Sequence, residues 1–186
     1  MLHKDGKRAG ALWWSDHVSN LTPIKSMYIG STLVWDAGGD RPVVDIVGST
    51  TQTSARNQMR AAVAGYGLDY QTVETLPFDV RFVESTNATN AFNGFSKLTV
   101  SPKIYAAPGE LIEARSMYRN CRSLEFVGDI NTGGVVEARE MFLYNTSLLD
   151  GAVRLIGKHP NVSTGNMLYG SGLTREPFYD TDGNPI

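Results

Sequence analysis

Residues 113–124 read EARSMYRNCRSL, and one period later residues 137–148 read EAREMFLYNTSL. Both segments begin with Glu-Ala-Arg, have an apolar pair in the middle and end in Ser-Leu. Two further segments share this pattern with more substitutions, AFNGFSKL at 91–98 and MLYGSGL at 167–173. Their central apolar residues are spaced by 26, 24 and 26 residues: Phe92, Tyr118, Phe142 and Leu168. A shared period in the twenties is typical of repeat proteins, in which each unit buries its apolar face only against its neighbours.

Composition limits the classes of function. The 186 residues, 41% of them hydrophobic, are enough for one compact body. A net charge of −2 gives no electrostatic attraction to nucleic acid, so we expect no nucleic-acid partner. No segment approaches the roughly 20 apolar residues of a membrane span, and the start of the chain lacks a signal-peptide core. Because Cys121 is the only cysteine, no intramolecular disulfide can form, and we expect assembly in the cytoplasm.

Residues 1–42 lie outside the repeat and form the first predicted unit, an aromatic-rich segment. Met27–Ile29 and Leu33–Trp35 flank Gly30-Ser31-Thr32, which predicts a β-hairpin with Tyr28 and Trp35 on one face. Trp13 and Trp14 need a partner, which is either this hairpin or another polypeptide. Residues 37–42, AGGDRP, predict a linker.

The second predicted unit, residues 43–74, contains a short strand at 43–47 and a helix. Thr53 or Ser54 is expected to begin the helix, which runs to about Ala64. Its spacing predicts one apolar face, formed by Met59, Ala62, Val63 and Tyr66. A helix placed directly before a repeat array predicts a terminal cap for the open core of the first repeat.

A second set of apolar residues predicts the strands of the repeat unit, residues 75–177. These residues recur every 26 positions: Phe78, Ile104, Ile130 and Ile156. Each unit should then hold one short strand, stacked on the next at about 4.8 Å, and one helical turn. The predicted fold class is therefore α/β, a short solenoid with one parallel sheet and short helical turns. Residues 178–186 form a tail that either folds back over the last repeat or docks elsewhere.

The repeats resemble the leucine-rich repeats of the bacterial surface-antigen type, the BspA-like group. Met117-Tyr118, Asn120-Cys121 and Ser123-Leu124 match that pattern almost in full. The other copies depart from it at the Asn-Cys position, and the last copy is one residue shorter. The resemblance implies a leucine-rich-repeat solenoid over about residues 75–177, and it carries little information about function.

A second resemblance concerns residues 22–35. Thr22-Pro23-Ile24-Lys25, Met27-Tyr28-Ile29-Gly30-Ser31 and Val34-Trp35 are similar to a short segment in minor tail proteins of tailed bacteriophages that infect actinobacteria. This resemblance implies a structural or adsorption protein of the virion, with other tail proteins as partners and no cofactor.

Candidate chemistry is weighed against plain structural roles. His3, His17 and His159 are far apart, which argues against a metal site. Cys121 has no catalytic signature and is expected to be a core thiol. Glu110, Glu113, Asp129, Glu137 and Glu140 could form an acid/base pair on adjacent repeats, as glycosidases require. We favour solvated repeat positions instead, with Glu113 paired to Arg115 and Glu137 paired to Arg139.

We therefore predict a non-enzymatic structural protein of a phage virion, with no catalytic, cofactor-binding or metal residues. Its expected partners are other virion proteins, with self-association and a host-surface glycan or protein as further partners. The alternatives are a receptor- or glycan-binding adsorption module and a cell-wall-degrading enzyme. The interface candidates are the aromatic residues Trp13, Trp14, Tyr28, Trp35, Tyr105, Phe178 and Tyr179.

Overall fold

The structure is a computed structural model that describes residues 26–29, 32–36, 41–107 and 109–186. The chain divides into two compact units, Met1–Arg41 and Pro42–Ile186. In the first unit, β1 (Ser26–Ile29) pairs antiparallel with β2 (Thr32–Asp36), with Ile29 opposite Thr32. The predicted hairpin is therefore present.

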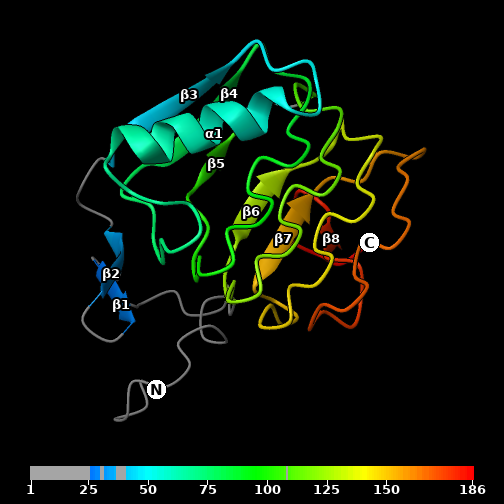
Figure 1. The fold of residues 1–186 in the computed structure, drawn as a ribbon. Helices are drawn as coiled ribbons and strands as arrows, with labels where there is room; N and C mark the ends of the chain where they lie inside the picture. Colours follow the sequence, from blue (N-terminus) through cyan, green and yellow to red (C-terminus); the bar gives the residue numbers. More distant parts are fainter. Residues whose placement is uncertain (1–25, 30–31, 37–40, 108) are drawn as a thin grey trace. The chain divides into compact units, whose positions relative to one another are not determined.

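The second unit is mixed α/β, with one helix and two small parallel sheets (Figure 1). The first sheet has the order β3 (Val43–Val47), β4 (Asp79–Val83), β5 (Ile104–Tyr105). The second has the order β6 (Gly128–Asn131), β7 (Val153–Ile156), β8 (Phe178–Tyr179). The prediction of one parallel sheet is wrong, because β5 and β6 do not pair.

Backbone hydrogen bonds explain why the sheet divides. The N–H of Ser101 donates forward to the carbonyl of Phe126 at 2.8 Å. The carbonyl of Lys103 instead accepts from the N–H of Val80 at 2.9 Å and so faces the preceding strand. Residues two apart in a regular strand face the same neighbour. The backbone therefore faces the following repeat at Ser101 and the preceding strand at Lys103. Pro102, which lies between them, has no N–H to donate, so regular hydrogen bonding toward β6 stops there.

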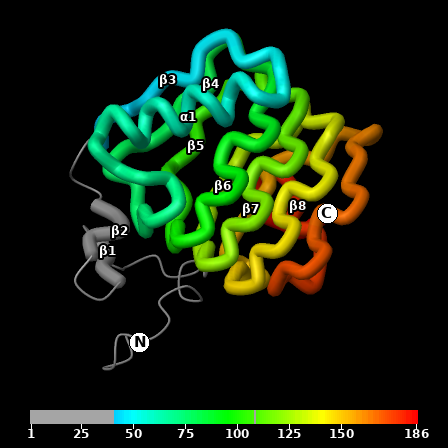
Figure 2. The backbone as a smooth tube through the Cα atoms, viewed as in Figure 1, coloured from blue at the N-terminus to red at the C-terminus, as the bar shows by residue number. Residues whose placement is uncertain are grey.

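The turns that follow the strands lie in register with one another (Figure 2). In each of the first three repeats, four alternate N–H groups donate to carbonyls of the next repeat, at 2.7–3.1 Å. The donors are Ala88, Asn90, Phe92 and Gly94, then Ala114, Ser116, Tyr118 and Asn120, then Ala138, Glu140, Phe142 and Tyr144. Phe92, Tyr118 and Phe142 occupy equivalent positions, which confirms the spacing of 26 and 24 residues predicted for them.

The same positions build the interior. The rings of Phe92 and Tyr118 are stacked with centroids 4.9 Å apart and planes 2° apart. The rings of Tyr118 and Phe142 are 5.8 Å and 11° apart. All three side chains are fully buried, and the partly buried Leu168 packs against the same core. The predicted interior residues therefore form one continuous core.

The predicted strand register is wrong in two places. Ile104 pairs with Val80 instead of Phe78, and Ile130 pairs with Leu155 instead of Ile156. The connections differ in length, because 13 residues separate Phe142 from Leu155 (142 to 155) whereas 12 separate Tyr118 from Ile130 (118 to 130). Because the length of this connection varies, the paired strand residues do not recur at the same spacing as the buried residues of the turns.

Helix α1 (Ser54–Gly65) lies at the first-repeat end of the row of turns in Figure 1. It follows Thr53, whose side chain makes no capping hydrogen bond, and it buries Ala55, Met59 and Val63 in the core. The side-chain amide of Gln58 binds both the N–H and the carbonyl of Val47, at 2.9 and 3.1 Å. The predicted helix and its buried face are confirmed, although Tyr66 remains 46% exposed.

The C-terminal segment folds back on the same body. β8 pairs with β7, Tyr179 makes an antiparallel bridge to Pro185, and the N–H of Ile186 donates to the carbonyl of Phe178 at 3.1 Å. Residues 178–186 therefore fold back along the sheet side of the last repeat. No helix in the described part of the chain has the length and apolar character needed to cross a membrane.

Candidate functional site

The solvent-facing side of the first sheet carries a charged row. Asp45, Arg81 and Tyr105 are register partners on β3, β4 and β5. The Arg81 guanidinium binds the Asp45 carboxylate through two bonds, Nε to Oδ1 at 2.8 Å and Nη2 to Oδ2 at 2.9 Å. The hydrogen bond from Arg81 lowers the pKa of Asp45. Because both side chains are exposed, this pair contributes orientation more than stability.

An open depression of about 470 Å³ lies beside this row. Tyr105 is 37% exposed there, and the Lys103 ammonium lies 4.8 Å from the centroid of its ring. The Glu110 carboxylate accepts a hydrogen bond from the N–H of Ala107 at 2.9 Å. The depression is lined by Arg81, Phe82, Val83, Ile104, Tyr105, Ala106, Ala107 and Glu110. It therefore combines the ring of Tyr105 with the Arg81 guanidinium, which is held by Asp45, and with the Glu110 carboxylate, which is held by the N–H of Ala107.

The second sheet carries a similar Asp-Arg pair. Asp129 and Arg154 are register partners, with Arg154 Nε 3.5 Å from Asp129 Oδ1. The Arg154 guanidinium lies 5.5 Å from the ring centroid of Tyr179. Partial burial raises the pKa of Asp129 despite the nearby Arg154. Charged pairs thus recur on the strands of both sheets.

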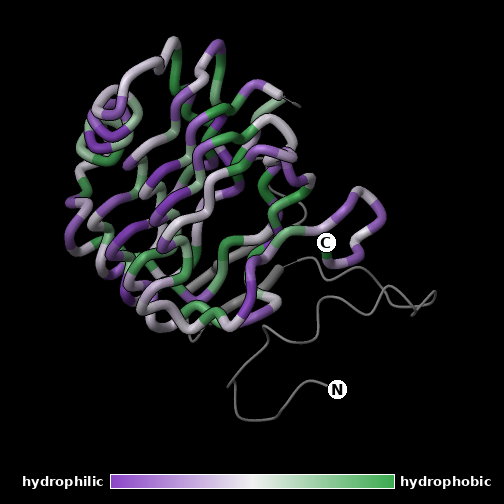
Figure 3. Tube along the Cα trace, turned by 90° about the vertical axis from the view of Figure 1, so that its right-hand side faces the viewer, coloured by the Kyte–Doolittle hydropathy of each residue, from purple (hydrophilic) through white to green (hydrophobic). Residues whose placement is uncertain are grey.

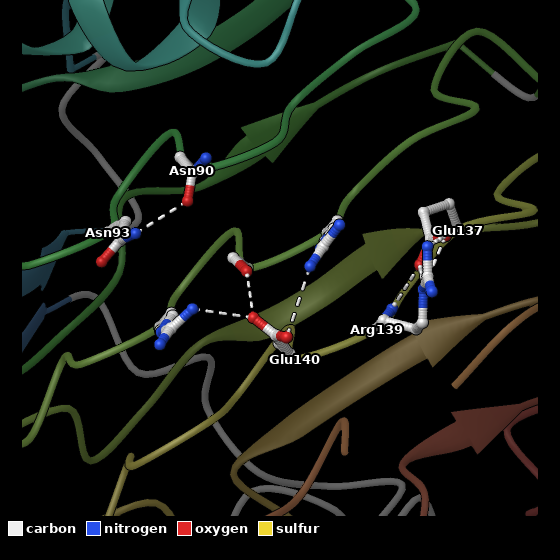
Figure 4. Close-up of polar contacts among 8 residues, drawn as sticks. Asn90, Asn93, Glu137, Arg139 and Glu140 are labelled. Carbon is white, nitrogen blue, oxygen red and sulfur yellow. Dashed lines mark hydrogen bonds and ion pairs between the residues drawn. The ribbon is translucent and has the colours of Figure 1, made fainter. Parts of the chain in front are cut away.

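On the turn side, the carboxylate of Glu140 gathers three donors from the preceding repeat (Figure 4). Ser116 Oγ lies 3.0 Å and Arg119 Nη1 2.8 Å from Glu140 Oε2, and Arg115 Nη2 lies 3.4 Å from Oε1. Partial burial opposes ionisation of Glu140, but the bonds from Ser116 and the two arginines outweigh it and lower its pKa. The cluster ties two consecutive repeats together.

The carboxylates considered as acid/base candidates have structural partners. Glu137 Oε2 lies 2.7 Å from Arg139 Nη2, as predicted. Partial burial opposes ionisation of Glu137, yet the bonds from Arg139 outweigh it and lower its pKa, whereas a glycosidase acid needs a raised pKa. The predicted pairing of Glu113 with Arg115 is wrong, because Asn87 Nδ2 donates to Glu113 at 2.7 Å and Arg115 contacts Glu140.

Cys121 is buried, as predicted, and its burial raises the pKa of the thiol. His159 Nδ1 accepts a hydrogen bond from the N–H of Asn161 at 3.2 Å. Among the residues that the structure describes, no three His, Cys, Asp or Glu side chains are grouped so that they could hold a metal ion. His3 and His17 lie outside these residues.

The structure separates the interface candidates. Tyr105 is exposed, whereas Phe178 and Tyr179 are only 1% and 8% exposed. Their assignment as surface contacts is wrong, because Phe178 is part of the hydrophobic core and the Arg154 guanidinium lies 5.5 Å from the ring centroid of Tyr179, so that little of either side chain is exposed. Tyr28 and Trp35 lie in β1 and β2, but their side chains, together with Trp13 and Trp14, lie outside the described residues.

Two further features join side chains of neighbouring repeats. The exposed rings of Tyr144 and Tyr169 meet edge to face on neighbouring repeats, with centroids 5.9 Å apart. The Glu140 cluster joins residues that are 21 to 25 positions apart in the chain. The signal that could have found this cluster is opposite charge at a separation of about one repeat.

Comparisons of the chain with protein-family models, with curated proteins and with solved structures found no match.

Proposed function

We propose that this chain is a non-enzymatic structural component of a tailed-phage virion, a minor tail or tail-tip protein. In this proposal residues 75–177 form a short leucine-rich-repeat solenoid of the BspA-like kind, and residues 1–42 attach it to neighbouring virion proteins. The protein is assembled in the host cytoplasm and presents its repeat surface on the particle.

The observation that carries the solenoid part is the repeated hydrogen-bond pattern of the turns. Three successive repeats use equivalent donors, and the rings of Phe92, Tyr118 and Phe142 stack in the interior. Equivalent positions also have left-handed backbone conformations, with φ of 62°, 54°, 58° and 56° at Asn90, Ser116, Glu140 and Asn166. Such repetition supports a structure in which each repeat packs only on its neighbours.

Two observations support the proposal that residues 1–42 attach the protein to the virion. The chain divides into two units, and residues 22–35 resemble a segment of phage minor tail proteins. The division at Arg41 and Pro42 coincides with the end of the predicted linker. The non-enzymatic part is supported by the partners of the carboxylates, since Glu113, Glu137 and Glu140 are all engaged in bonds to other side chains.

The test is to locate the protein in particles. Phage purified from a host that carries this gene should be labelled by an antibody against residues 42–186, and the label should lie on the tail. A chain that lacks residues 1–41 should be produced but not incorporated. Particles without the protein, or equal incorporation of the truncated chain, would contradict the proposal.

A receptor- or glycan-binding role is the second candidate, and the depression beside Tyr105 favours it. An exposed aromatic ring close to a fixed carboxylate and a fixed guanidinium offers both stacking and hydrogen bonding to a sugar. A glycan array should then show binding that Tyr105→Ala abolishes and Tyr144→Ala, at another exposed tyrosine, leaves unchanged. Equal signals for both variants would reject this candidate.

A further inference from the structure

The last repeat differs from the first three in its backbone hydrogen bonds. The residues equivalent to the donors Ala138, Glu140, Phe142 and Tyr144 lie 26 positions later: Thr164, Asn166, Leu168 and Gly170. Within the described part of the chain, the N–H groups of these four residues have no hydrogen-bond acceptor. The turn 164–170, here called the open turn, thus presents a row of free donors on alternate residues.

The carbonyls of the same turn face the other way. Those of Ser163, Gly165, Met167 and Tyr169 accept from the preceding repeat at 2.9–3.1 Å. The outward side of the open turn therefore carries donors without matching acceptors. Its side chains are accessible as well, since Tyr169 is 63% exposed. Figure 3 turns this end of the repeats toward the viewer.

The described residues of the chain leave most of the open turn uncovered. After the last repeat it enters β8, which pairs with β7, and residues 180–186 reverse along β8. This segment closes the sheet side. Glu176, just before β8, hydrogen-bonds to the side chain of Thr164, and among the described residues the N–H groups of Asn166, Leu168 and Gly170 stay without an acceptor. A turn that lacks its neighbour leaves donors and apolar surface available, as an unpaired strand does at a sheet edge.

The opposite end of the row is closed. Ser49 Oγ donates to the carbonyl of Asn87 at 2.7 Å, and α1 buries Met59 and Val63 against the first repeat. The carbonyls that could receive the donors of an open turn are therefore covered in every copy of the chain. Two open turns cannot pair with each other either, because each offers only donors.

We propose that the open turn is a docking surface for a segment of a different polypeptide, which supplies backbone carbonyls on alternate residues. The three internal junctions define the complement, namely a turn whose carbonyls lie at the spacing of Glu137, Arg139, Met141 and Leu143. Each completed hydrogen bond stabilises the docked segment, and burial of Leu168 and Tyr169 adds to this. The inference depends on the hydrogen bonds of the repeats and holds whether or not the protein belongs to a virion.

The test supplies such a turn to the full chain. A copy of residues 135–148, whose carbonyls already accept from the preceding repeat, is attached after Ile186 through a Gly/Ser linker of roughly 20 residues, which spans about 25 Å. Amide hydrogen exchange is then measured residue by residue. The amides of Asn166, Leu168 and Gly170 should exchange at least about tenfold more slowly than in the unmodified chain. A linker that carries a scrambled 135–148 sequence is the matched control and should have no effect.

Four results would overturn the proposal. The first is slow exchange at these amides in the unmodified chain, and the second is no slowing with the attached turn. The third is equal slowing with the scrambled sequence or with inorganic phosphate, which would indicate non-specific contact or an anion site. The fourth is concentration-dependent protection of the unmodified chain together with an increase in its mass by light scattering, which would make a second copy the occupant.

Discussion

Tyr118 shows how one polar atom is accommodated in the stacked core. Its hydroxyl lies 2.7 Å from Ser101 Oγ, and Ser101 donates its own hydrogen to the carbonyl of Pro102 at 2.8 Å. The tyrosine hydroxyl is therefore the donor of the pair. Burial raises the pKa of Tyr118, so the hydroxyl stays protonated at neutral pH.

Tyr118→Phe should therefore lower the free energy of unfolding by about 1 kcal/mol, because one buried hydrogen bond is lost while the ring stack remains. Urea denaturation measures the loss. Tyr144→Phe is the control, since Tyr144 is 39% exposed. Equal losses in both variants would mean that the bond to Ser101 does not stabilise the core.

Glu140 predicts a pH dependence of stability. Its pKa is lowered in the folded protein, so the unfolded chain binds more protons as the pH falls. The stabilisation is complete above the unfolded pKa of about 4.3 and is lost as the pH falls through the lower folded value. Glu140→Gln should lower the free energy of unfolding by about 1 kcal/mol at pH 7 and by less at acidic pH.

Urea unfolding of Glu140→Gln and the unmodified protein between neutral and acidic pH measures this difference. Glu74→Gln changes an exposed glutamate and is the control that should follow the unmodified protein at every pH. A loss in Glu140→Gln that is constant over the whole range would show that the charge of Glu140 is not responsible.

At the scale of elements, neighbouring connections approach too closely for side chains at certain positions. A Cβ at Gly134 would lie 2.6 Å from Gly109 Cα and 3.0 Å from the Leu111 carbonyl oxygen. Both are backbone atoms, so neither can move without shifting a whole repeat. A Cβ at the adjacent Gly133 would meet only the Asn131 side chain, at 3.7 Å.

Gly134→Ala should therefore lower the free energy of unfolding by about 1–3 kcal/mol, the usual range for overpacking. Gly133→Ala is the matched control and should be close to neutral. Thermal unfolding of the two variants gives the comparison directly. If Gly133→Ala is as destabilising as Gly134→Ala, close approach of the connections is not the cause.

At the scale of the whole molecule, the two units differ in what they can bury. The unit Pro42–Ile186 contains α1, both parallel sheets and the continuous core, whereas the described part of Met1–Arg41 is a single hairpin. An isolated two-stranded hairpin is marginally stable in water. Stability should therefore reside in the second unit.

A chain that consists of residues 42–186 should unfold cooperatively, with a melting temperature within a few degrees of that of the full protein. Calorimetry of the two chains measures this. A broad or absent transition in the truncated chain would show that residues 1–41 complete the core. That result would also change the interpretation of the incorporation test, because the truncated chain would be absent from particles for lack of folding.

The sequence by itself determined the spacing of Phe92, Tyr118 and Phe142, the hairpin, and the buried face of α1. Each of these depends on local chemistry or on a repeated environment, and equivalent environments select similar residues at a fixed period. The tertiary structure alone decided the strand register, the division of the sheet at Pro102 and the burial of Phe178 and Tyr179. It also decided that the donors of Arg115 and Arg119 meet at Glu140. These features depend on contacts between residues far apart in the chain, and the variable connection lengths shift the strand register relative to the repeat period.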